Sequence, residues 1–158
     1  MKLLICGHRP YKFPPQVFGE VKRDIRERLE ILASQDEFEL ELNCGMALGT
    51  DIFAAKVASQ LSIPFVAYVP FVGFDSKWTP DQQAELATLL DKAKFVHIIE
   101  KKPSKQAFIL RDKAMVEDSD QVIAYLISHD SGTGHTVKFA HELHKPVKVI
   151  EPNGLLLK

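Results

Sequence analysis

The sequence predicts an α/β fold, with an open, mostly parallel, doubly wound sheet of about six strands and helices on both faces. Two observations lead to this prediction. Short apolar runs alternate with longer amphipathic runs along the 158 residues, which is the pattern of β-α-β units. The short runs are also continuously apolar, as expected for strands in a sheet that is covered on both faces.

The first half of the chain is predicted to hold three strands and two helices. Apolar residues recur every three or four positions in both helical runs, which gives each helix one buried face. In order, the elements are a strand at 2–6, a helix at 16–34, a strand at 38–43, a helix at 50–61 and a strand at 64–69. The apolar stripes are Val17, Val21, Ile25, Leu29 and Leu32 in the first helix and Phe53, Ala54, Val57, Ala58 and Leu61 in the second.

The second half continues the alternation. In order, it is predicted to hold a helix at 80–92, a strand at 95–99, a helix at 104–117, a strand at 121–127, a helix at 136–145 and a strand at 146–150. Thr79 suits the N-cap of the helix that begins at Pro80, because proline is well tolerated at the first helical position. The right-handed crossovers of such units favour a Rossmann-like arrangement, and we expect residues 1–158 to form a single domain.

Composition limits the possible functions. Apolar residues make up 46% and charged residues 26% of the chain, which is typical of a globular protein. The net charge of −1 argues against binding duplex DNA mainly through overall positive charge, although a local basic groove remains compatible with it. Because no apolar run approaches membrane-spanning length, we expect a cytoplasmic protein with no membrane association.

Cysteine and histidine spacing gives no sign of a metal centre. Cys6 and Cys44 each end a predicted strand, and we expect both to be buried thiols rather than a disulfide. His141 and His144 share a helix face, but the sequence offers no third ligand beside them. We therefore expect no metal ion and no resident cofactor.

Two glycine-bearing turns, each between a predicted strand and a predicted helix, are the most informative feature of the chain. They span residues 45–51 (GMALGTD) and 131–136 (SGTGHT). Such a unit directs free backbone N–H groups and the positive end of a helix at one spot. Glycine also lets a phosphate approach the main chain closely. Two such turns predict a phosphorylated, nucleotide-like ligand.

Four segments that are far apart in the sequence should meet at the carboxyl edge of the sheet, where open parallel sheets bind ligands. They are residues 7–10, 45–51, 70–78 and 129–136. The guanidinium of Arg9 is suited to phosphate. The candidate ligand-binding residues are Gly7, His8, Arg9, Gly45, Ala47, Gly49, Asp51, Pro70, Phe74, Trp78, Arg111, Ser131, Gly132, Thr133, Gly134, His135 and Thr136.

Several of these residues have two possible roles. Asp51 suits a ribose hydroxyl as well as a helix cap or a loop contact. Phe71, Phe74 and Trp78 suit either stacking on a base or packing in a lid. Arg111 faces inward beside Phe108 and so needs a partner, either the ligand or one of Asp112, Asp118 and Asp120.

A catalytic set is not visible. His8 lies in the segment at 7–10 and His135 in the glycine turn at 131–136. Either histidine suits a phosphate contact or acid–base chemistry. Arg111 and Asp51 are the candidates for catalytic residues. Because no complete set can be assembled from spacing, binding without catalysis is favoured over an enzyme.

The whole set of motifs resembles the SLOG superfamily of Rossmann-like nucleotide-binding proteins, and in particular the small YspA-, YpsA- and YoqJ-like proteins of bacteria and phages. The motifs that carry the resemblance are residues 7–10 (GHRP), Gly45-x-Ala47-x-Gly49-x-Asp51 followed by Ala55, Arg111-x-x-x-Met115 followed by Ser119 and Asp120, and Gly132-x-Gly134-His135-Thr136. The resemblance implies sensing or processing of nucleotides or nucleotide-derived ligands, and a homodimer.

Two branches of that superfamily supply alternatives. Lonely-guy phosphoribohydrolases, which split a base from a nucleoside monophosphate, resemble this chain at Arg111, Gly132 and Gly134. Their signature glutamate corresponds to Lys138, which cannot stabilise a cationic sugar, so an enzyme of this type would need Asp51 or Asp130 instead.

The DNA-processing protein A family, which binds single-stranded DNA, has a turn similar to residues 44–51 (CGMALGTD). For that function Arg9, Lys12, Lys77 and Arg111 would supply part of a positive track. The leading hypothesis is binding of a nucleotide-derived ligand at the carboxyl edge of the sheet, ahead of N-glycosidase activity and of single-stranded nucleic-acid binding.

Overall fold

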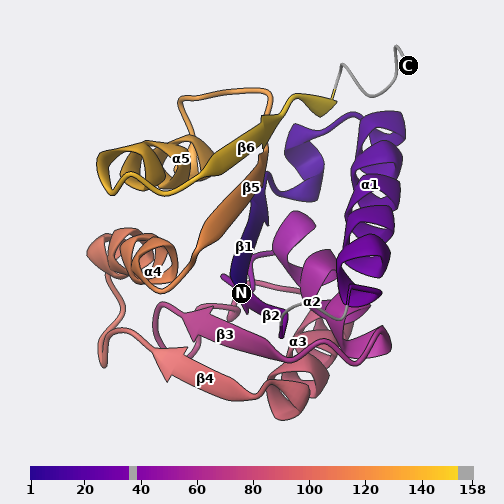
Figure 1. Ribbon diagram of the computed structural model, residues 1–158. Coiled ribbons are helices and arrows are strands. Elements are labelled where there is room, and N and C mark those ends of the chain that lie inside the picture. Colours follow the sequence, from indigo (N-terminus) through magenta and orange to yellow (C-terminus); the bar gives the residue numbers. More distant parts are fainter. Residues whose placement is uncertain (36–38, 153–158) are drawn as a thin grey trace.

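Six parallel strands form one open sheet in the order β4-β3-β2-β1-β5-β6 in the computed structural model, which describes residues 1–35 and 39–152 (Figure 1). The prediction of an open α/β sheet is confirmed, and every strand pair is parallel. The strands are β1 (Lys2–Gly7), β2 (Glu41–Cys44), β3 (Phe65–Val69), β4 (Phe95–Ile98), β5 (Gln121–Tyr125) and β6 (Val147–Ile150). The second predicted strand began at Phe38, which lies outside the described residues.

The helices form two layers. The first three pack on one face of the sheet and the last two on the other, as Figure 1 shows. They are α1 (Pro15–Ala33), α2 (Thr50–Gln60), α3 (Pro80–Lys92), α4 (Lys105–Glu117) and α5 (Gly132–Glu142). Side chains of β1 alternate between the layers: Leu3 and Ile5 join the core under the first three helices, and Leu4 joins the other core.

The strand order reverses beside β1, which makes this point a topological switch point. Successive strands from β1 to β4 add on one side, whereas β5 pairs with the other side of β1. The two strands run side by side to their ends, where Gly7 is paired with Tyr125. In open α/β sheets the crevice beyond the carboxyl ends at such a switch point is the usual ligand site.

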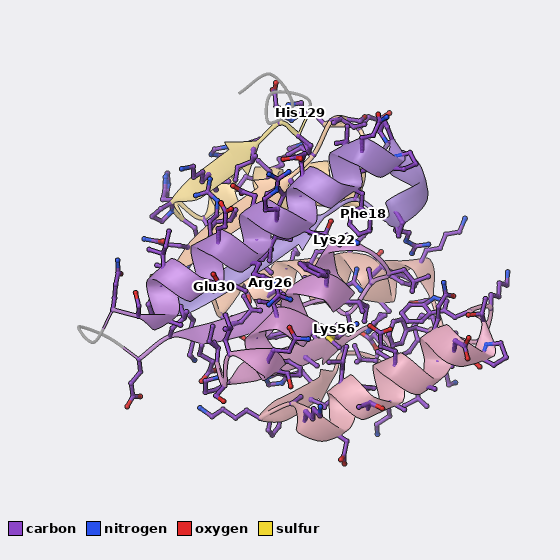
Figure 2. The ribbon with its side chains drawn as sticks, turned by 90° about the vertical axis from the view of Figure 1, so that its right-hand side faces the viewer. Phe18, Lys22, Arg26, Glu30, Lys56 and His129 are labelled. Atoms are coloured by element: carbon purple, nitrogen blue, oxygen red, sulfur yellow. The ribbon has the colours of Figure 1, made fainter. Side chains whose placement is uncertain are left out.

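The outer faces of α1 and α2 are polar. Lys22, Arg26 and Glu30 lie along α1, and Lys56 projects from α2 (Figure 2). Where the helices cross, the Lys22 ammonium lies 5.9 Å from the centre of the Phe53 ring, so this cation covers apolar surface. Within the described part of the chain, no helix is both long and apolar enough to cross a bilayer.

At the carboxyl edge of the sheet, two element boundaries differ from the prediction by more than one residue. Helix α5 begins at Gly132 rather than at Thr136, because Ser131 acts as its N-cap and accepts the Gly134 N–H at 3.0 Å. Strand β5 ends at Tyr125 rather than at Ile127, whose N–H donates to His8 instead of continuing the sheet. A short 3-10 helix, Pro10–Lys12, was not predicted.

Candidate ligand-binding site

A cleft of about 310 Å³ lies at the carboxyl edge, next to the switch point between β1 and β5. It is formed by the segment after β1, the turn before α2, one face of α4 and the first turn of α5. Its lining residues are Cys6, Gly7, His8, Arg9, Lys12, Ala47, Asp51, Phe108, Arg111, Asp112, Met115, Ser131, Gly132, Thr133 and Thr136. The structure therefore brings three of the four predicted segments, 7–10, 45–51 and 129–136, around one cavity, whereas α4 takes the place expected for 70–78.

The first turn of α5 presents backbone donors to this cleft. The side-chain oxygen of Ser131 takes the N–H of Gly134, and its hydroxyl donates to the Ser128 carbonyl at 2.7 Å. The His135 N–H donates to the Ser131 carbonyl. Within the described residues, the N–H groups of Gly132 and Thr133 have no partner, as is usual at the start of a helix. They lie at the positive end of the helix dipole.

Two exposed cations also line the cleft. Arg9 is the last residue before the 3-10 helix, and Lys12 is the last residue in it. Neither forms an ion pair with any described residue. Their charges are therefore available to a ligand in the cleft.

Arg111 is a third cation, and it is almost completely buried, with 8% of the residue exposed. Its Nη1 donates to the Gly45 carbonyl at 2.9 Å, and its Nε donates to Asp112 Oδ1 at 3.1 Å. Its guanidinium also lies over the Phe108 ring, 5.5 Å from the ring centre. The first of the three predicted acid partners is thus the real one, and Arg111 lines the cleft as well.

Asp118 and Asp120, the other two predicted partners of Arg111, form hydrogen bonds with other residues. Asp118 accepts the Tyr68 hydroxyl at 2.7 Å, and Asp120 accepts the Lys2 backbone N–H at 2.8 Å. Asp112 stays beside Arg111 in the cleft, and burial raises the pKa of its carboxyl while Arg111 opposes the rise.

Asp51 is a buried carboxylate with an unused oxygen. Only 6% of the residue is exposed, and its Oδ2 accepts the Ala47 N–H at 3.3 Å. Its Oδ1 is buried without a hydrogen bond to any described residue. Burial raises the pKa of Asp51 to about 7, although Arg111 and nearby backbone N–H groups act in the opposite direction. Asp51 therefore holds the preceding turn with one oxygen and leaves the other without a partner.

His8 joins two loops of the cleft. The residue is 3% exposed, and its Nε2 accepts the N–H groups of Ile127 at 2.9 Å and Ser128 at 3.3 Å. This nitrogen must be unprotonated to accept them, so the ring is neutral. Burial and then Lys12 lower the pKa of His8. His8 thus positions the loop before α5, and its Nε2 is not free for phosphate.

The glycines of the two turns differ in the space around them and in their backbone conformation. A side chain at Gly134 would place its Cβ 2.6 Å from the His129 carbonyl carbon and closer still to the carbonyl oxygen, so only glycine fits under that loop. Gly49 has a φ of 94° and lies against Pro10, and it lets the turn at 45–51 pass close to the loop after β1. At Gly132 nothing lies within 4 Å of the position that a Cβ would take, so the space around this residue is open.

Some predicted site residues do not line the cleft. Phe74 and Trp78 pack edge to face, with their ring centres 5.4 Å apart. Both pack against the hydrophobic core between the sheet and the first three helices. The stacking role expected for them therefore does not fall in this cleft. The remaining predicted residues outside the lining are Gly45, Gly49, Pro70, Gly134 and His135.

The predicted site did not include Phe108, although the residue lines the cleft and its ring centre lies 5.5 Å from that of Phe71. Its position three residues before Arg111, on the same helix face, is the signal that would have identified it. Cys6, Asp112 and Met115 were likewise not expected to line the site, and Lys12 had been named only for the positive track of a single-stranded DNA binder.

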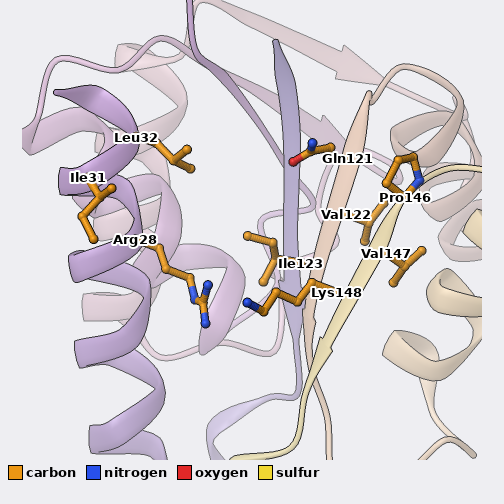
Figure 3. A pocket seen from close by; sticks show the side chains of 9 residues that line it. All are labelled: Arg28, Ile31, Leu32, Gln121, Val122, Ile123, Pro146, Val147 and Lys148. Atoms are coloured by element: carbon orange, nitrogen blue, oxygen red, sulfur yellow. The ribbon is translucent and has the colours of Figure 1, made fainter. Parts of the chain in front are cut away.

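A second hollow of about 400 Å³ lies at the other end of the strands. Figure 3 shows it between α1 and the beginnings of β5 and β6, with the Arg28 and Lys148 side chains beside Ile31 and Ile123. The Arg28 guanidinium is already paired with Asp24 at 2.7 Å. The residues that line this hollow include no helix N-terminus and no glycine turn, so it lacks the donors that favour the first cleft.

The fold and the cleft define a Rossmann-like α/β protein with a polar cavity at its topological switch point. The chain belongs to the YspA SLOG family, whose family model matches residues 3–151. Among curated relatives, a UPF0398 protein of Lysinibacillus sphaericus is 22% identical over 148 residues, which cover 85% of this chain and 81% of that protein.

Solved structures share the fold at low sequence identity. DNA processing protein A from Helicobacter pylori, whose structure concerns single-stranded DNA binding, has a TM-score of 0.68 at 20% identity and covers 98% of this chain and 71% of its own. The same protein from Streptococcus pneumoniae has a TM-score of 0.64 at 19% identity and covers 93% of this chain, which spans only 50% of that protein. The molybdenum cofactor binding protein of Rippkaea orientalis has a TM-score of 0.61 at 16% identity and covers 99% of this chain and 80% of its own.

Proposed function

We propose that the protein binds a small phosphorylated ligand, a nucleotide or a nucleotide derivative, in the cleft at the carboxyl edge of the sheet. One observation carries the proposal. Arg9 and Lys12, which form no ion pair with any described residue, face the same cavity as the N–H groups of Gly132 and Thr133. Phosphate is well matched to guanidinium groups and to helix N-termini.

The remaining lining suits the rest of such a ligand. A cavity of about 310 Å³ is at the small end of the range for small-molecule sites. Phe108 offers an aromatic face next to Arg111, and Asp51 offers a hydrogen-bond acceptor. Solved proteins of this fold are described as binding single-stranded DNA and molybdenum cofactor, which supports a ligand-binding role in general.

Thermal unfolding in the presence of candidate ligands tests the proposal. The screen contains the ribonucleoside mono-, di- and triphosphates, ADP-ribose, cyclic dinucleotides and inorganic phosphate. A ligand that binds the folded state raises the apparent stability by mass action. We expect at least one nucleotide to stabilise the protein, and no stabilisation by any of these compounds would contradict the proposal.

Variants locate the site. Arg9→Ala and Lys12→Ala each remove one cation from the cleft, and each should weaken binding about tenfold or more, since hydrogen bonds to charged groups contribute about 1.5–3 kcal/mol. Arg23→Ala is the matched control, because Arg23 lies on α1, pairs with Glu20 and does not line the cleft. Equal affinity in all three variants would place the ligand elsewhere.

A second candidate, a nucleoside 5′-phosphate N-glycosidase, is favoured by Asp51. Its buried carboxyl group, with a pKa raised to about 7 by burial, lines the cleft near Arg111. Such a group is suited to acid–base work near neutral pH. Release of free base from nucleoside monophosphates would establish this activity, and its loss in Asp51→Asn would assign the residue.

Other assays cover the remaining expectations. A gel shift with single-stranded DNA at two salt concentrations detects nucleic-acid binding, which should weaken as salt rises. Light scattering during gel filtration tests the homodimer that the resemblance implies. Cell fractionation tests the cytoplasmic location, and limited proteolysis tests whether residues 1–158 behave as one domain.

A further inference from the structure

Asp51 places a second requirement on the ligand, in addition to a phosphate. The residue lies in the first turn of α2 and lines the cleft, whereas the cations and the α5 N-terminus belong to other elements around it. One carboxylate oxygen is committed to the Ala47 N–H, and the other is buried with no partner among the described residues. A buried polar atom left without a hydrogen bond costs about 1–3 kcal/mol.

Among the described lining residues, Oδ1 accepts no hydrogen bond, although the Gly7 N–H, like that of Ala47, acts on the Asp51 carboxyl and lowers its pKa. Arg111, the lining cation that lowers the pKa of Asp51, directs its hydrogen bonds to Gly45 and Asp112 instead. When Asp51 is ionised, Oδ1 can only accept a hydrogen bond, so a bound molecule would satisfy it by presenting an O–H or N–H group. A ligand that was only an anion would instead be repelled there.

We infer that the cleft selects a phosphorylated ligand whose sugar carries free hydroxyl groups, with a ribose hydroxyl donating to Asp51 Oδ1. This inference rests on the proposed function and narrows it to ribonucleotides and related sugar phosphates. Asp51 is then the residue that sets specificity, and Arg9, Lys12 and the α5 N-terminus supply the affinity for phosphate.

Asp51 is suited to such discrimination. Sites built to bond a hydroxyl group reject analogues that lack it, because the buried polar partner is then left unpaired. Ionisation of the carboxyl also becomes easier when a donor contacts it, so a bound hydroxyl would reverse part of the rise in pKa that burial causes.

Calorimetric titration tests the inference with adenosine 5′-monophosphate, its 2′-deoxy and 3′-deoxy forms, and inorganic phosphate, or with the same series on the base that stabilises the protein most. We expect at least one deoxy form to bind the wild type about tenfold more weakly than the ribonucleotide. In Asp51→Ala, which leaves no side-chain group to bond a hydroxyl, the ribonucleotide and both deoxy forms should bind alike, and inorganic phosphate should bind at least as tightly as to the wild type because a repelling carboxylate has been removed. Asp81→Asn, a change to an exposed acid of α3 outside the cleft, should keep the discrimination.

The possible failures are distinct. Equal affinity of the wild type for the ribonucleotide and both deoxy forms would overturn the inference and leave the proposed function standing. If neither inorganic phosphate nor any nucleotide binds, both are overturned. Discrimination that persists in Asp51→Ala would assign the hydroxyl contact to another residue and also overturn the inference.

Discussion

At the scale of single residues, Asp51 should make the free energy of unfolding fall as the pH rises. Its pKa rises from the ordinary value of 3.8 to about 7 on folding, chiefly because of burial. Between those values the folded protein holds a proton that the unfolded chain releases, so this contribution to stability is full below pH 3.8 and is lost as the pH rises through about 7. In Asp51→Asn the loss should disappear.

Urea unfolding of the wild type and of Asp51→Asn at several pH values measures this effect. The free energy of unfolding of the wild type should fall relative to that of the variant by on the order of 2–4 kcal/mol between about pH 4 and pH 8. Other titrating groups cancel in this difference, because they are present in both proteins. Parallel profiles would show that Asp51 ionises normally in the fold.

Gly134 and Gly132 make a matched pair of tests. A Cβ at Gly134 would lie 2.6 Å from the His129 carbonyl carbon, whereas one at Gly132 would meet nothing within 4 Å. Gly134→Ala should therefore reduce the free energy of unfolding by about 3 kcal/mol, and Gly132→Ala should change it by less than about 1 kcal/mol. Thermal or urea unfolding checks both values, and equal stability of the two variants would contradict the packing described.

At the scale of elements, His8 should control how firmly the segment between β5 and α5 is held. Replacing it with alanine leaves the Ile127 and Ser128 N–H groups without their acceptor, at a cost of about 2 kcal/mol. His8→Ala should also speed hydrogen exchange at the Ile127 amide, and His8→Gln, which keeps an acceptor, should recover part of the protection. Unchanged exchange at Ile127 in His8→Ala would contradict this role.

The elements themselves could largely be predicted from the sequence, and the exceptions have local causes. Continuous apolar runs and three-to-four spacing located the strands and helices because burial on both faces leaves a clear pattern. The start of α5 was misplaced because Ser131 caps it through a side-chain contact, and the glycines then belong to the helix. The end of β5 depended on His8, a contact that spans 119 residues of sequence and leaves no local pattern.

At the scale of the whole molecule, the convergence of distant loops followed from topology. Parallel strands bring their carboxyl ends to one edge, so Arg9, Asp51 and Gly132 could be expected near one another before any contact was known. The layer against which a loop packs its side chains could not be predicted. The segment after β3 turns Phe74 and Trp78 toward the first helical layer, and α4 instead brings Phe108 to the cleft.

The central claim is that a phosphorylated ligand binds where the α5 N-terminus faces Arg9 and Lys12. Backbone NMR during titration with the nucleotide that stabilises the protein most tests it directly. We predict that the largest changes in amide resonances occur at Gly132 and Thr133, and that Arg9→Ala weakens them. Changes confined to the hollow between α1 and β6, around Ile31 and Lys148, would contradict the claim.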